Sequence, residues 1–457
     1  MMTESQRAAL AEYAAVKGQC PARERLAALF DDGVYTETGS NLRAGENLAG
    51  VVTAYGYIGG TPAYAFSQDS TVMKGAVSLA HSAKICKMFE LAARNGVPVV
   101  GIYDSCGAFV EDGADALNAY SDILLSMGSL SGVVPMVSVI SGVCAGTMAM
   151  IASSADFSVI TEGAELYLDA SGNNASAESA AKSGAVSAYA KSDAEAMDTV
   201  RRYLSLMPQN NLSPLPEFEF DAPVSAAFDN AENAAESIAD AGSILEVYGE
   251  YGTASYTALC TVSGVTAGIA ATNKTKDKLT SADCSKIARF VRLCDAYSIP
   301  VITVADTEGF DLHGADMVRA SAALAGAYAE ASCAKIALVS GKACGMAYIA
   351  FAGRNVAADA VYALPEAVIA PMDPVSAAEF LYHDKLKGAD DLAAARAQIA
   401  KEYAENEGSA FAAAAKGAAD EVVTAENVRA AVASVLDVTA GKRLNKRLPK
   451  KHNILPL

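Results

Sequence analysis

Two short turns of small residues are the positions in this sequence best suited to chemistry. Cys144-Ala145-Gly146 follows a strand-like run, PMVSVISG, and Ala343-Cys344-Gly345 follows another, KIALVSG. A helix-like segment comes directly after each turn, TMAMIASSA in the first case and MAYIAFAG in the second. The first N–H groups of a helix have no intrahelical acceptor, and they stabilise negative charge that develops on a carbonyl oxygen. Two turns therefore predict two carbonyl-binding sites.

The side chains that usually perform catalysis are scarce. The histidines are His81, His313, His383 and His452, and none has the spacing of a metal ligand or lies near a GxSxG motif. We therefore predict no metal site and no Ser-His-Asp site, and we expect the chemistry to use backbone groups and cofactors.

The two turns belong to an internal repeat. Four features of the first half recur 202 residues later: Lys84-Ile85, Pro98, Asp104 and Gly107 correspond to Lys286-Ile287, Pro300, Asp306 and Gly309. Around the turns the offset is 199. Matched features at a fixed offset indicate two copies of one structural design.

The repeated design consists of a helix, a buried strand, a second strand, the turn and another helix. The helical stretches KICKMFELAARNG and KIARFVRLCDAYS carry apolar residues at three- and four-residue spacing. The strands VPVVGIYD from Val97 and IPVITVAD from Ile299 are short apolar runs typical of parallel sheets covered on both faces, and each ends in Asp. The pattern predicts an α/β fold.

A chain of 457 residues is too long for one ordinary core, so two domains are expected. The stretch from Gln209 to Pro223 is rich in Asn and Pro and lacks a helical or alternating pattern, which indicates a linker. We therefore predict an N-terminal domain over residues 1–222 and a C-terminal domain over residues 223–457.

Composition excludes several classes of function. The net charge of -18 disfavours nucleic-acid binding. The nine cysteines are odd in number and never form CxxC, which predicts a reducing, cytoplasmic location and no zinc ribbon. The stretch from Ile123 to Ala155 is uncharged and long enough to span a bilayer, but Gly, Ser and Pro divide it. We expect a buried strand, a turn and a helix there.

Several long stretches resemble one known family. They are PARERLAALFDDG from Pro21, FSQDSTVMKGAVSLAHSAKICKMFELA from Phe66, DSCGA from Asp104, LTSADCSKIARFVRLCDAYSIPVITVADTEGF from Leu279 and KKHNILPL at the end. They are similar to segments of the carboxyltransferase subunits of propionyl-CoA carboxylase and of the methylmalonyl-CoA and glutaconyl-CoA decarboxylases. The resemblance spans nearly the whole chain.

The resemblance implies a fold, a cofactor and partners. It implies two crotonase-like domains of the ClpP/crotonase ββα-superhelix type, related by duplication and assembled as a ring of six subunits. It implies that the N-terminal domain binds an acyl-CoA and the C-terminal domain binds biotin. No AMKM biotin-attachment motif occurs, so the biotin is expected on a separate carrier protein. Further expected partners are a biotin carboxylase or the membrane subunits of a decarboxylase, through which the chain would attach to a membrane.

The resemblance also implies roles for particular residues. Gly146 and Thr147 match the turn that holds the thioester carbonyl, and Met346 and Ala347 match the turn that holds the ureido carbonyl of biotin. The remaining substrate-binding positions are Cys106, Gly107, Ala108, Ala145, Gly309, Phe310, Gly345 and Ile349.

Some of these positions depart from the family. Thr147 and Met346 replace the second of two paired glycines, so the turns function only if their φ angles suit a residue with a side chain. Cys106 replaces a glycine of DSGGA, and Ile349 stands where an acidic residue is common. Two alternatives therefore stay open: a non-catalytic subunit of such a complex, and a biotin-independent hydrolase or isomerase. The latter would need an acidic residue near the first turn, and Asp104, Glu111 and Asp112 are the candidates.

Overall fold

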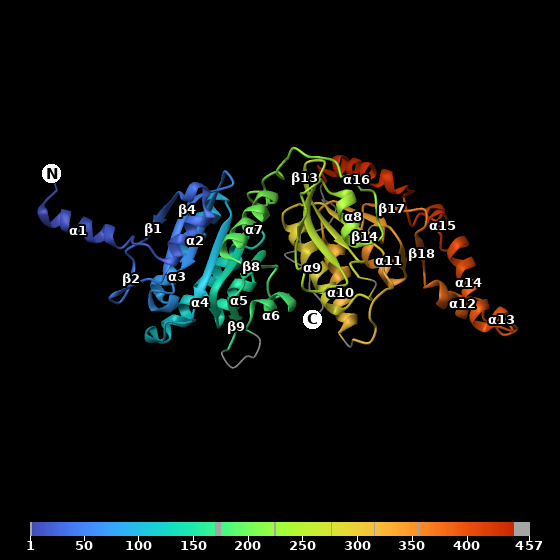
Figure 1. Ribbon diagram of the computed structural model, residues 1–457, viewed down its shortest axis with the longest axis horizontal. Coiled ribbons are helices and arrows are strands. Elements are labelled where there is room, and N and C mark those ends of the chain that lie inside the picture. The colour runs from blue at the N-terminus through green and yellow to red at the C-terminus, as the bar shows by residue number, and fades with distance from the viewer. Residues whose placement is uncertain are drawn as a thin grey trace, which may run out of the picture. The chain divides into compact units, whose positions relative to one another are not determined.

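The computed structural model describes residues 2–169, 175–223, 225–275, 277–314, 316–354 and 356–442. The chain separates into two compact units, Met1–Pro214 and Leu215–Leu457; in Figure 1 the colour runs from blue to green along the first and from green to red along the second. The described residues of 209–223 are mostly turns and irregular backbone. The terminal KKHNILPL segment, which contributed to the family resemblance, lies outside the described residues.

The N-terminal unit is built on a mixed sheet. Its strands are β1 Tyr35–Thr38, β2 Arg43–Ala44, β3 Asn47–Leu48, β4 Val51–Ile58, β5 Thr61–Gln68, β6 Val99–Ser105, β7 Met136–Ala145, β8 Phe157–Thr161, β9 Glu165–Tyr167 and β10 Ala188–Ala190. Its helices are α1 Glu4–Ala15, α2 Pro21–Leu29, α3 Leu79–Asn95, α4 Asp115–Leu130, α5 Thr147–Ser153, α6 Ala177–Lys182 and α7 Asp193–Leu206. The main sheet has the order β1-β4-β5-β6-β7-β8-β10, and β9 also pairs with β7.

The C-terminal unit repeats this plan. Its strands are β11 Leu245–Glu246, β12 Tyr256–Val262, β13 Val265–Ala271, β14 Val301–Ala305, β15 Lys335–Val339, β16 Lys342–Cys344, β17 Ala360–Ala363, β18 Val368–Ala370 and β19 Glu421–Val422. Its helices are α8 Ala231–Ile238, α9 Ser281–Ala296, α10 Met317–Glu330, α11 Met346–Phe351, α12 Pro374–Leu381, α13 His383–Leu386, α14 Leu392–Asn406, α15 Ala410–Ala415 and α16 Ala425–Thr439. The main sheet has the order β11-β12-β13-β14-β15-β17-β19.

The strand register shows that the two sheets are equivalent. In both units an antiparallel hairpin, β4–β5 or β12–β13, leads into parallel strands. Tyr103 of β6 pairs with Ile140 of β7, and Ala305 of β14 pairs with Val339 of β15, which are the residues 202 and 199 positions later. The offsets seen in the sequence therefore correspond to matched positions in three dimensions.

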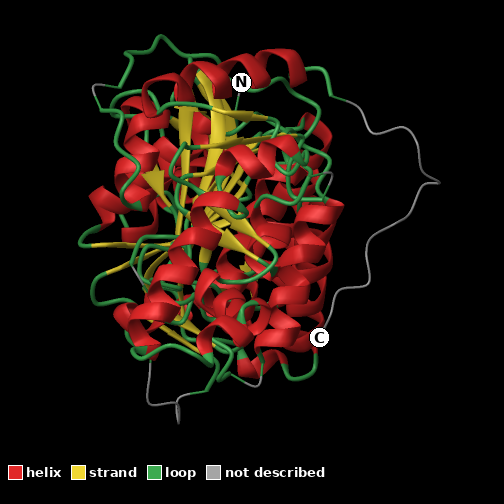
Figure 2. Ribbon diagram, turned by 90° about the vertical axis from the view of Figure 1, so that its right-hand side faces the viewer, coloured by secondary structure: helices red, strands yellow, loops and turns green. Residues whose placement is uncertain are grey.

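The apolar faces of the predicted helices form the cores. In α3, Ile85, Met88, Phe89 and Ala92 are buried, at the spacing expected of an amphipathic helix. This helix starts earlier than its apolar pattern suggested because the side chain of Ser78 accepts a hydrogen bond from the backbone N–H of His81. The strands lie inside the layer of helices, as Figure 2 shows.

One buried lysine recurs in both copies. Lys84 in α3 donates a hydrogen bond from Nζ to the carbonyl of Val51, where β4 begins. Lys286 in α9 donates from Nζ to the carbonyl of Ser255, 2.9 Å away, just before β12. Burial lowers the pKa of each ammonium group to about 8. Each lysine therefore anchors a helix to the start of the neighbouring hairpin.

The uncharged stretch from Ile123 to Ala155 folds as separate short elements. It comprises the end of α4, the strand β7 and the helix α5. Among the described helices, none is both long enough and apolar enough to cross a bilayer.

Candidate active site

The first turn is shaped by Gly146. This residue connects β7 to α5 with φ 64° and ψ -138°, a conformation that only glycine adopts readily. Its N–H donates to the carbonyl of Tyr167 in β9, 2.9 Å away, so it is not free to bind a ligand. Thr147 is the first residue of α5 and is exposed. As the first residue of the helix, Thr147 has a backbone N–H with no intrahelical acceptor, so this N–H can serve as a donor in the turn.

The second turn has the same construction. Gly345 connects β16 to α11 with φ 53° and ψ -121°. Its N–H donates to the carbonyl of Ala370 in β18, 2.9 Å away. Met346 begins α11 with an exposed side chain, and Ala347 follows it with its side chain buried. The N–H groups of these two residues lie at the open start of the helix.

This construction explains how both turns tolerate a residue other than glycine. The conformation that requires glycine falls on Gly146 and Gly345, which the chain retains. Thr147 and Met346 instead have ordinary helical backbone at the start of α5 and α11. A side chain at these two positions therefore costs no backbone strain.

In each unit the predicted substrate-binding residues lie beside the turn. Ser105, which precedes Cys106-Gly107-Ala108, pairs with Cys144 of β7. In the C-terminal unit the N–H of Thr307 donates to the carbonyl of Lys342 in β16, 2.8 Å away, and thereby brings Gly309 near the second turn. Strand pairing thus brings each Asp-x-x-Gly segment together with its turn.

The other predicted positions differ in how accessible they are. Ala145 is buried at the end of β7, whereas Cys106 and Ala108 are exposed. Phe310 is also buried and packs against Phe351, with ring centroids 6.1 Å apart. Ile349 is 55% exposed on α11. Phe310 consequently supports the site from the core, while Ile349 faces outward.

Asp104, near the end of β6, and Asp306, directly after β14, are held in place by hydrogen bonds. The carboxylate of Asp104 accepts hydrogen bonds from Arg25 at 2.9 Å and from Ser70 at 2.8 Å. The carboxylate of Asp306 accepts from Asn273 at 3.2 Å and from the backbone N–H of Lys342 at 2.8 Å. Carboxylates that are engaged in this way hold strands in place.

A comparison with protein families identifies the chain. Residues 14–455 match the family model described as the carboxyl transferase domain. The chain belongs to the carboxyl transferase family.

Individual carboxyl transferases match over nearly the full length. The methylmalonyl-CoA decarboxylase subunit alpha of Propionigenium modestum is 33% identical over 96% of this chain and 94% of its own length. The propionyl-CoA carboxylase beta chain of Cereibacter sphaeroides is 31% identical over 96% of this chain and 94% of its own length. A crystal structure of transcarboxylase 12S with hydrolyzed methylmalonyl-coenzyme A bound superposes with a TM-score of 0.90 at 30% identity, covering all of both chains. The predicted family, the two-domain crotonase-like fold and the carboxyltransferase function are confirmed.

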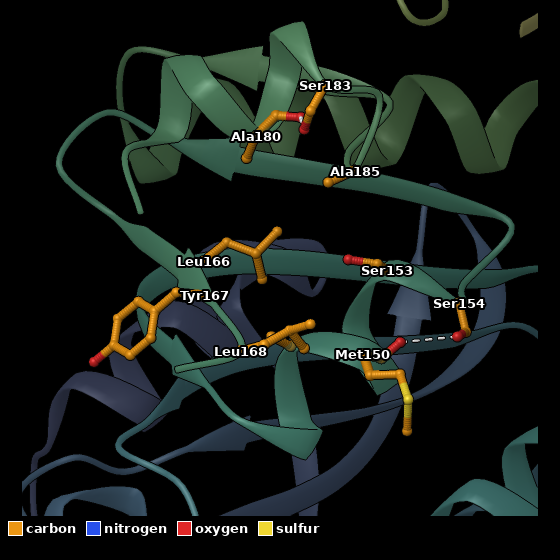
Figure 3. Close-up of a pocket in the computed structure, with 10 residues that line it drawn as sticks. Met150, Ser153, Ser154, Leu166, Tyr167, Leu168, Ala180, Ser183 and Ala185 are labelled. Carbon is orange, nitrogen blue, oxygen red and sulfur yellow. Dashed lines mark hydrogen bonds between the residues drawn. The ribbon is translucent and has the colours of Figure 1, made fainter. Parts of the chain in front are cut away.

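A pocket adjoins the first turn of this carboxyl transferase. It has a volume of about 490 Å³ and is bordered by α5, β9 and the region of α6, as Figure 3 shows. Met150 and Ser153 line it, and they lie three and six residues after Thr147 on one face of α5. The other described lining residues are Ala149, Ser154, Leu166, Tyr167, Leu168, Ala180, Ser183 and Ala185, so the lining is mainly apolar and carries no charge.

Reasoning from sequence missed the residues that secure Asp104. Arg25 lies in PARERLAALFDDG, a segment that resembles the family but by itself indicates no role for this arginine. The guanidinium of Arg25 also donates to the carbonyl of Ser141 at 3.2 Å and pairs with Asp193 at 3.3 Å. The signal available was an arginine on the polar side of a short helix, which gives no indication of a partner so distant in the chain.

Two of the acidic candidates for a hydrolase are engaged elsewhere. Asp104 is held by Arg25, and Asp112 accepts a hydrogen bond from the N–H of Leu79 at 3.1 Å. Glu111 is exposed. His81 is buried in α3, and burial lowers its pKa to about 3, so its ring is neutral. Within the described ranges no group of His, Cys, Asp and Glu side chains is placed to hold a metal ion.

Proposed function

We propose that the chain transfers a carboxyl group between biotin on a separate carrier protein and the α-carbon of a short acyl-CoA of the propionyl or methylmalonyl type. The observation that carries this proposal is the duplicated turn, in which Gly146 and Gly345 each fix the open start of a helix. The reaction involves two carbonyl groups on which negative charge develops, and the chain has one such turn in each unit.

The N-terminal turn is proposed to bind the thioester. The N–H of Thr147 would donate to the thioester oxygen, which becomes more negative as the α-proton leaves. The pocket beside α5 would hold the apolar acyl and pantetheine portion, because its lining is uncharged and its volume falls within the range of small-molecule sites. Cys106 and Ala108 would border the thioester from the neighbouring segment.

The C-terminal turn fits biotin. The N–H groups of Met346 and Ala347 would offer two donors to the ureido carbonyl oxygen, which can accept two hydrogen bonds. When bound, biotin supplies the carboxyl group and a base for the α-proton. The exposed side chains of Met346 and Ile349 would border the ring. The chain itself orients the ring and stabilises negative charge on its oxygen.

The proposed reaction requires partner proteins. A biotin carrier protein would deliver the carboxyl group, together with either a biotin carboxylase or membrane decarboxylase subunits. Transcarboxylase 12S is described as a hexamer, and we propose the same homo-hexameric assembly for this chain. We place the protein in the cytoplasm, with any membrane attachment made through partners.

The deciding experiment removes a single N–H. Proline is well suited to the first position of a helix but has no N–H, so Thr147→Pro should retain α5 while losing the donor. Decarboxylation of malonyl-CoA, methylmalonyl-CoA and glutaconyl-CoA would be measured separately with purified protein and free biotin. We expect one thioester to react and Thr147→Pro to lower kcat by about 10²- to 10³-fold.

Thr147→Gly is the matched control, since it keeps the N–H and should retain most of the activity. Binding of CoA esters without turnover in the unaltered protein would identify a non-catalytic subunit of the complex. Equal activity of Thr147→Pro and Thr147→Gly would exclude the proposed role of the turn.

A further inference from the structure

Two carboxylates share the ammonium group of Lys342 close to the second turn. Its Nζ donates to the carboxylate of Glu308 at 2.7 Å and also forms an ion pair with the carboxylate of Asp373. Lys342 is the first residue of β16, three residues before Gly345. The side chain of Lys342 is 23% exposed and that of Glu308 is 58% exposed, so this cluster lies at the surface of the unit and not in its core.

The two carboxylates come from different segments of the chain. Glu308 belongs to the segment 306–310, in which the N–H of Thr307 donates to the carbonyl of Lys342 at 2.8 Å. Asp373 caps the start of α12 by accepting a hydrogen bond, 2.9 Å long, from the N–H two residues later. The side chain of Lys342 therefore connects a predicted substrate-binding segment to the beginning of a helix.

The second of these segments also contacts the turn directly. The N–H of Gly345 donates to the carbonyl of Ala370, the last residue of β18. The carbonyl oxygen of Pro371, two residues before Asp373, lies 3.0 Å from the Cβ position of Gly345. One ammonium group thus joins the two segments that border the second turn.

The first turn has no such ion pair at the matching positions. Val143 in β7 lies 199 residues before Lys342, and Cys106 lies 202 residues before Glu308. Neither side chain carries a charge, although both turns have the same glycine-dependent backbone. The charged cluster is therefore not needed for the fold that the two units share, which indicates a role specific to the ligand of the second turn.

We propose that Lys342 is a positioning residue for biotin, and this inference rests on the function proposed above. Through Glu308 and Asp373, its ammonium group holds the two segments at the spacing in which the ureido ring fits beside the turn. Ion pairs that are partly exposed add little to overall stability, but charge-assisted hydrogen bonds fix the orientation of the groups they join. A border that is already ordered lowers the entropy cost of binding the ring.

Steady-state kinetics of Lys342→Met test the proposal. The decarboxylation assay would use biotin methyl ester, which is uncharged and so cannot pair directly with the ammonium group. We expect KM for the biotin ester to rise about tenfold, with kcat and KM for the thioester changing less than about twofold. Lys342→Arg should restore most of the affinity for the biotin ester, since a guanidinium can pair with both carboxylates. An equal rise in both KM values would overturn the proposal.

The double variant Glu308→Gln, Asp373→Asn removes the other half of the cluster. Asparagine is also a good helix cap, so α12 should keep its start. This variant should raise KM for the biotin ester as much as Lys342→Met does, and combining all three substitutions should add no further increase, because the same interaction is lost. Fully additive increases would contradict the proposed connection.

Lys442→Met is the matched control. Lys442 also forms a 2.7 Å ion pair, with Asp359, whose carboxylate accepts from the N–H of Lys335 at the opposite end of β15 from the turn. Its substitution should leave KM for the biotin ester unchanged, and an increase equal to that of Lys342→Met would count against a role specific to the turn.

Hydrogen exchange followed by mass spectrometry separates this proposal from the proposed reaction, because it requires no turnover. Peptides covering 306–310 and 371–376 should exchange faster in Lys342→Met and not in Lys442→Met. Unchanged exchange in Lys342→Met would overturn the proposal. If the exchange differs as expected but the unaltered chain decarboxylates no thioester, the proposed reaction is wrong while the role of Lys342 in ordering the turn is supported.

Discussion

The carboxylate of Asp104 occupies the space that a side chain at Gly142 would need. A Cβ built on Gly142 overlaps this carboxylate, and a Cβ on Gly341 overlaps the carboxylate of Asp306 in the same way. Both glycines precede the turn in their unit. The aspartate and the glycine therefore act as a pair, in which the missing side chain lets the carboxylate reach the following strand.

Gly341→Ala should consequently destabilise the C-terminal unit. The methyl group would displace Asp306 from the N–H of Lys342, and overpacking of this kind costs about 1–3 kcal/mol. Urea denaturation would measure the loss. Gly326→Ala is the control, because Gly326 lies inside α10 and the position of an added Cβ is open, so alanine there should be neutral or stabilising. Equal effects of the two substitutions would contradict the pairing of Asp306 with Gly341.

Gly146→Ala should reduce turnover for a conformational reason alone. No atom lies within 4 Å of the Cβ position, so the methyl group meets no obstacle. Its φ of 64° and ψ of -138° would nevertheless be strained by about 1–3 kcal/mol with alanine. We expect kcat for decarboxylation to fall more than tenfold as the N–H of Thr147 turns away, with the circular dichroism spectrum unchanged. Unaltered kinetics would show that the glycine conformation does not position the donor.

Cys106 should be the thiol that reacts fastest in the folded protein. It is the only exposed cysteine of the nine, whereas burial raises the pKa of thiols such as Cys284 and Cys333 to about 12. Alkylation with iodoacetamide followed by peptide mass spectrometry would rank the nine sites. An acyl-CoA at the first turn should slow labelling of Cys106 several-fold and leave the partly buried Cys344 unaffected. If acyl-CoA does not change the rate at which Cys106 is labelled, the ligand binds away from this segment.

The buried lysines should make stability depend on alkaline pH. Burial lowers the pKa of Lys286 from 10.5 to about 8, so the unfolded chain binds more protons than the folded chain between these values. The contribution of Lys286 to the free energy of unfolding therefore increases with pH in this window. Relative to Lys286→Met, the unaltered protein should gain about 2 kcal/mol between pH 7.5 and 9.5.

Urea denaturation at the two pH values measures this difference. The control is Lys87→Met on α3, because the side chain of Lys87 is 61% exposed. Its substitution should give the same difference in stability at both pH values. A difference for Lys286→Met that does not change with pH would show that this ammonium group is better solvated than its burial indicates.

Local patterns in the sequence were sufficient to predict the repeated elements. The apolar runs that end in Asp104 and Asp306 form β6 and β14 with their following loops. The small-residue turns lead into the starts of α5 and α11. Apolar periodicity and small residues report on the immediate neighbours of a residue, which is why these elements could be located. The two halves also differ in one respect: the single strand β7 corresponds to two strands, β15 and β16.

Contacts between distant segments could not be predicted in this way. Arg25 and Asp104 lie 79 residues apart, and nothing in the residues around either one indicates the other. The sequence also did not show that Gly146 has the unusual backbone conformation while Thr147 is helical, because it does not indicate which residue of a turn has positive φ. Both features depend on how the strands pair, which is decided by the whole sheet.

The position of the strained residue in each turn has a consequence for how such chains diversify. Because Gly146 and Gly345 alone carry the unusual backbone, positions 147 and 346 are free to vary without loss of the fold. Thr147 and Met346 have exposed side chains directly beside the proposed donors. A mutant library randomised at these two codons would therefore sample new acyl preferences with little loss of folded protein, whereas one randomised at the glycines would yield mostly inactive variants.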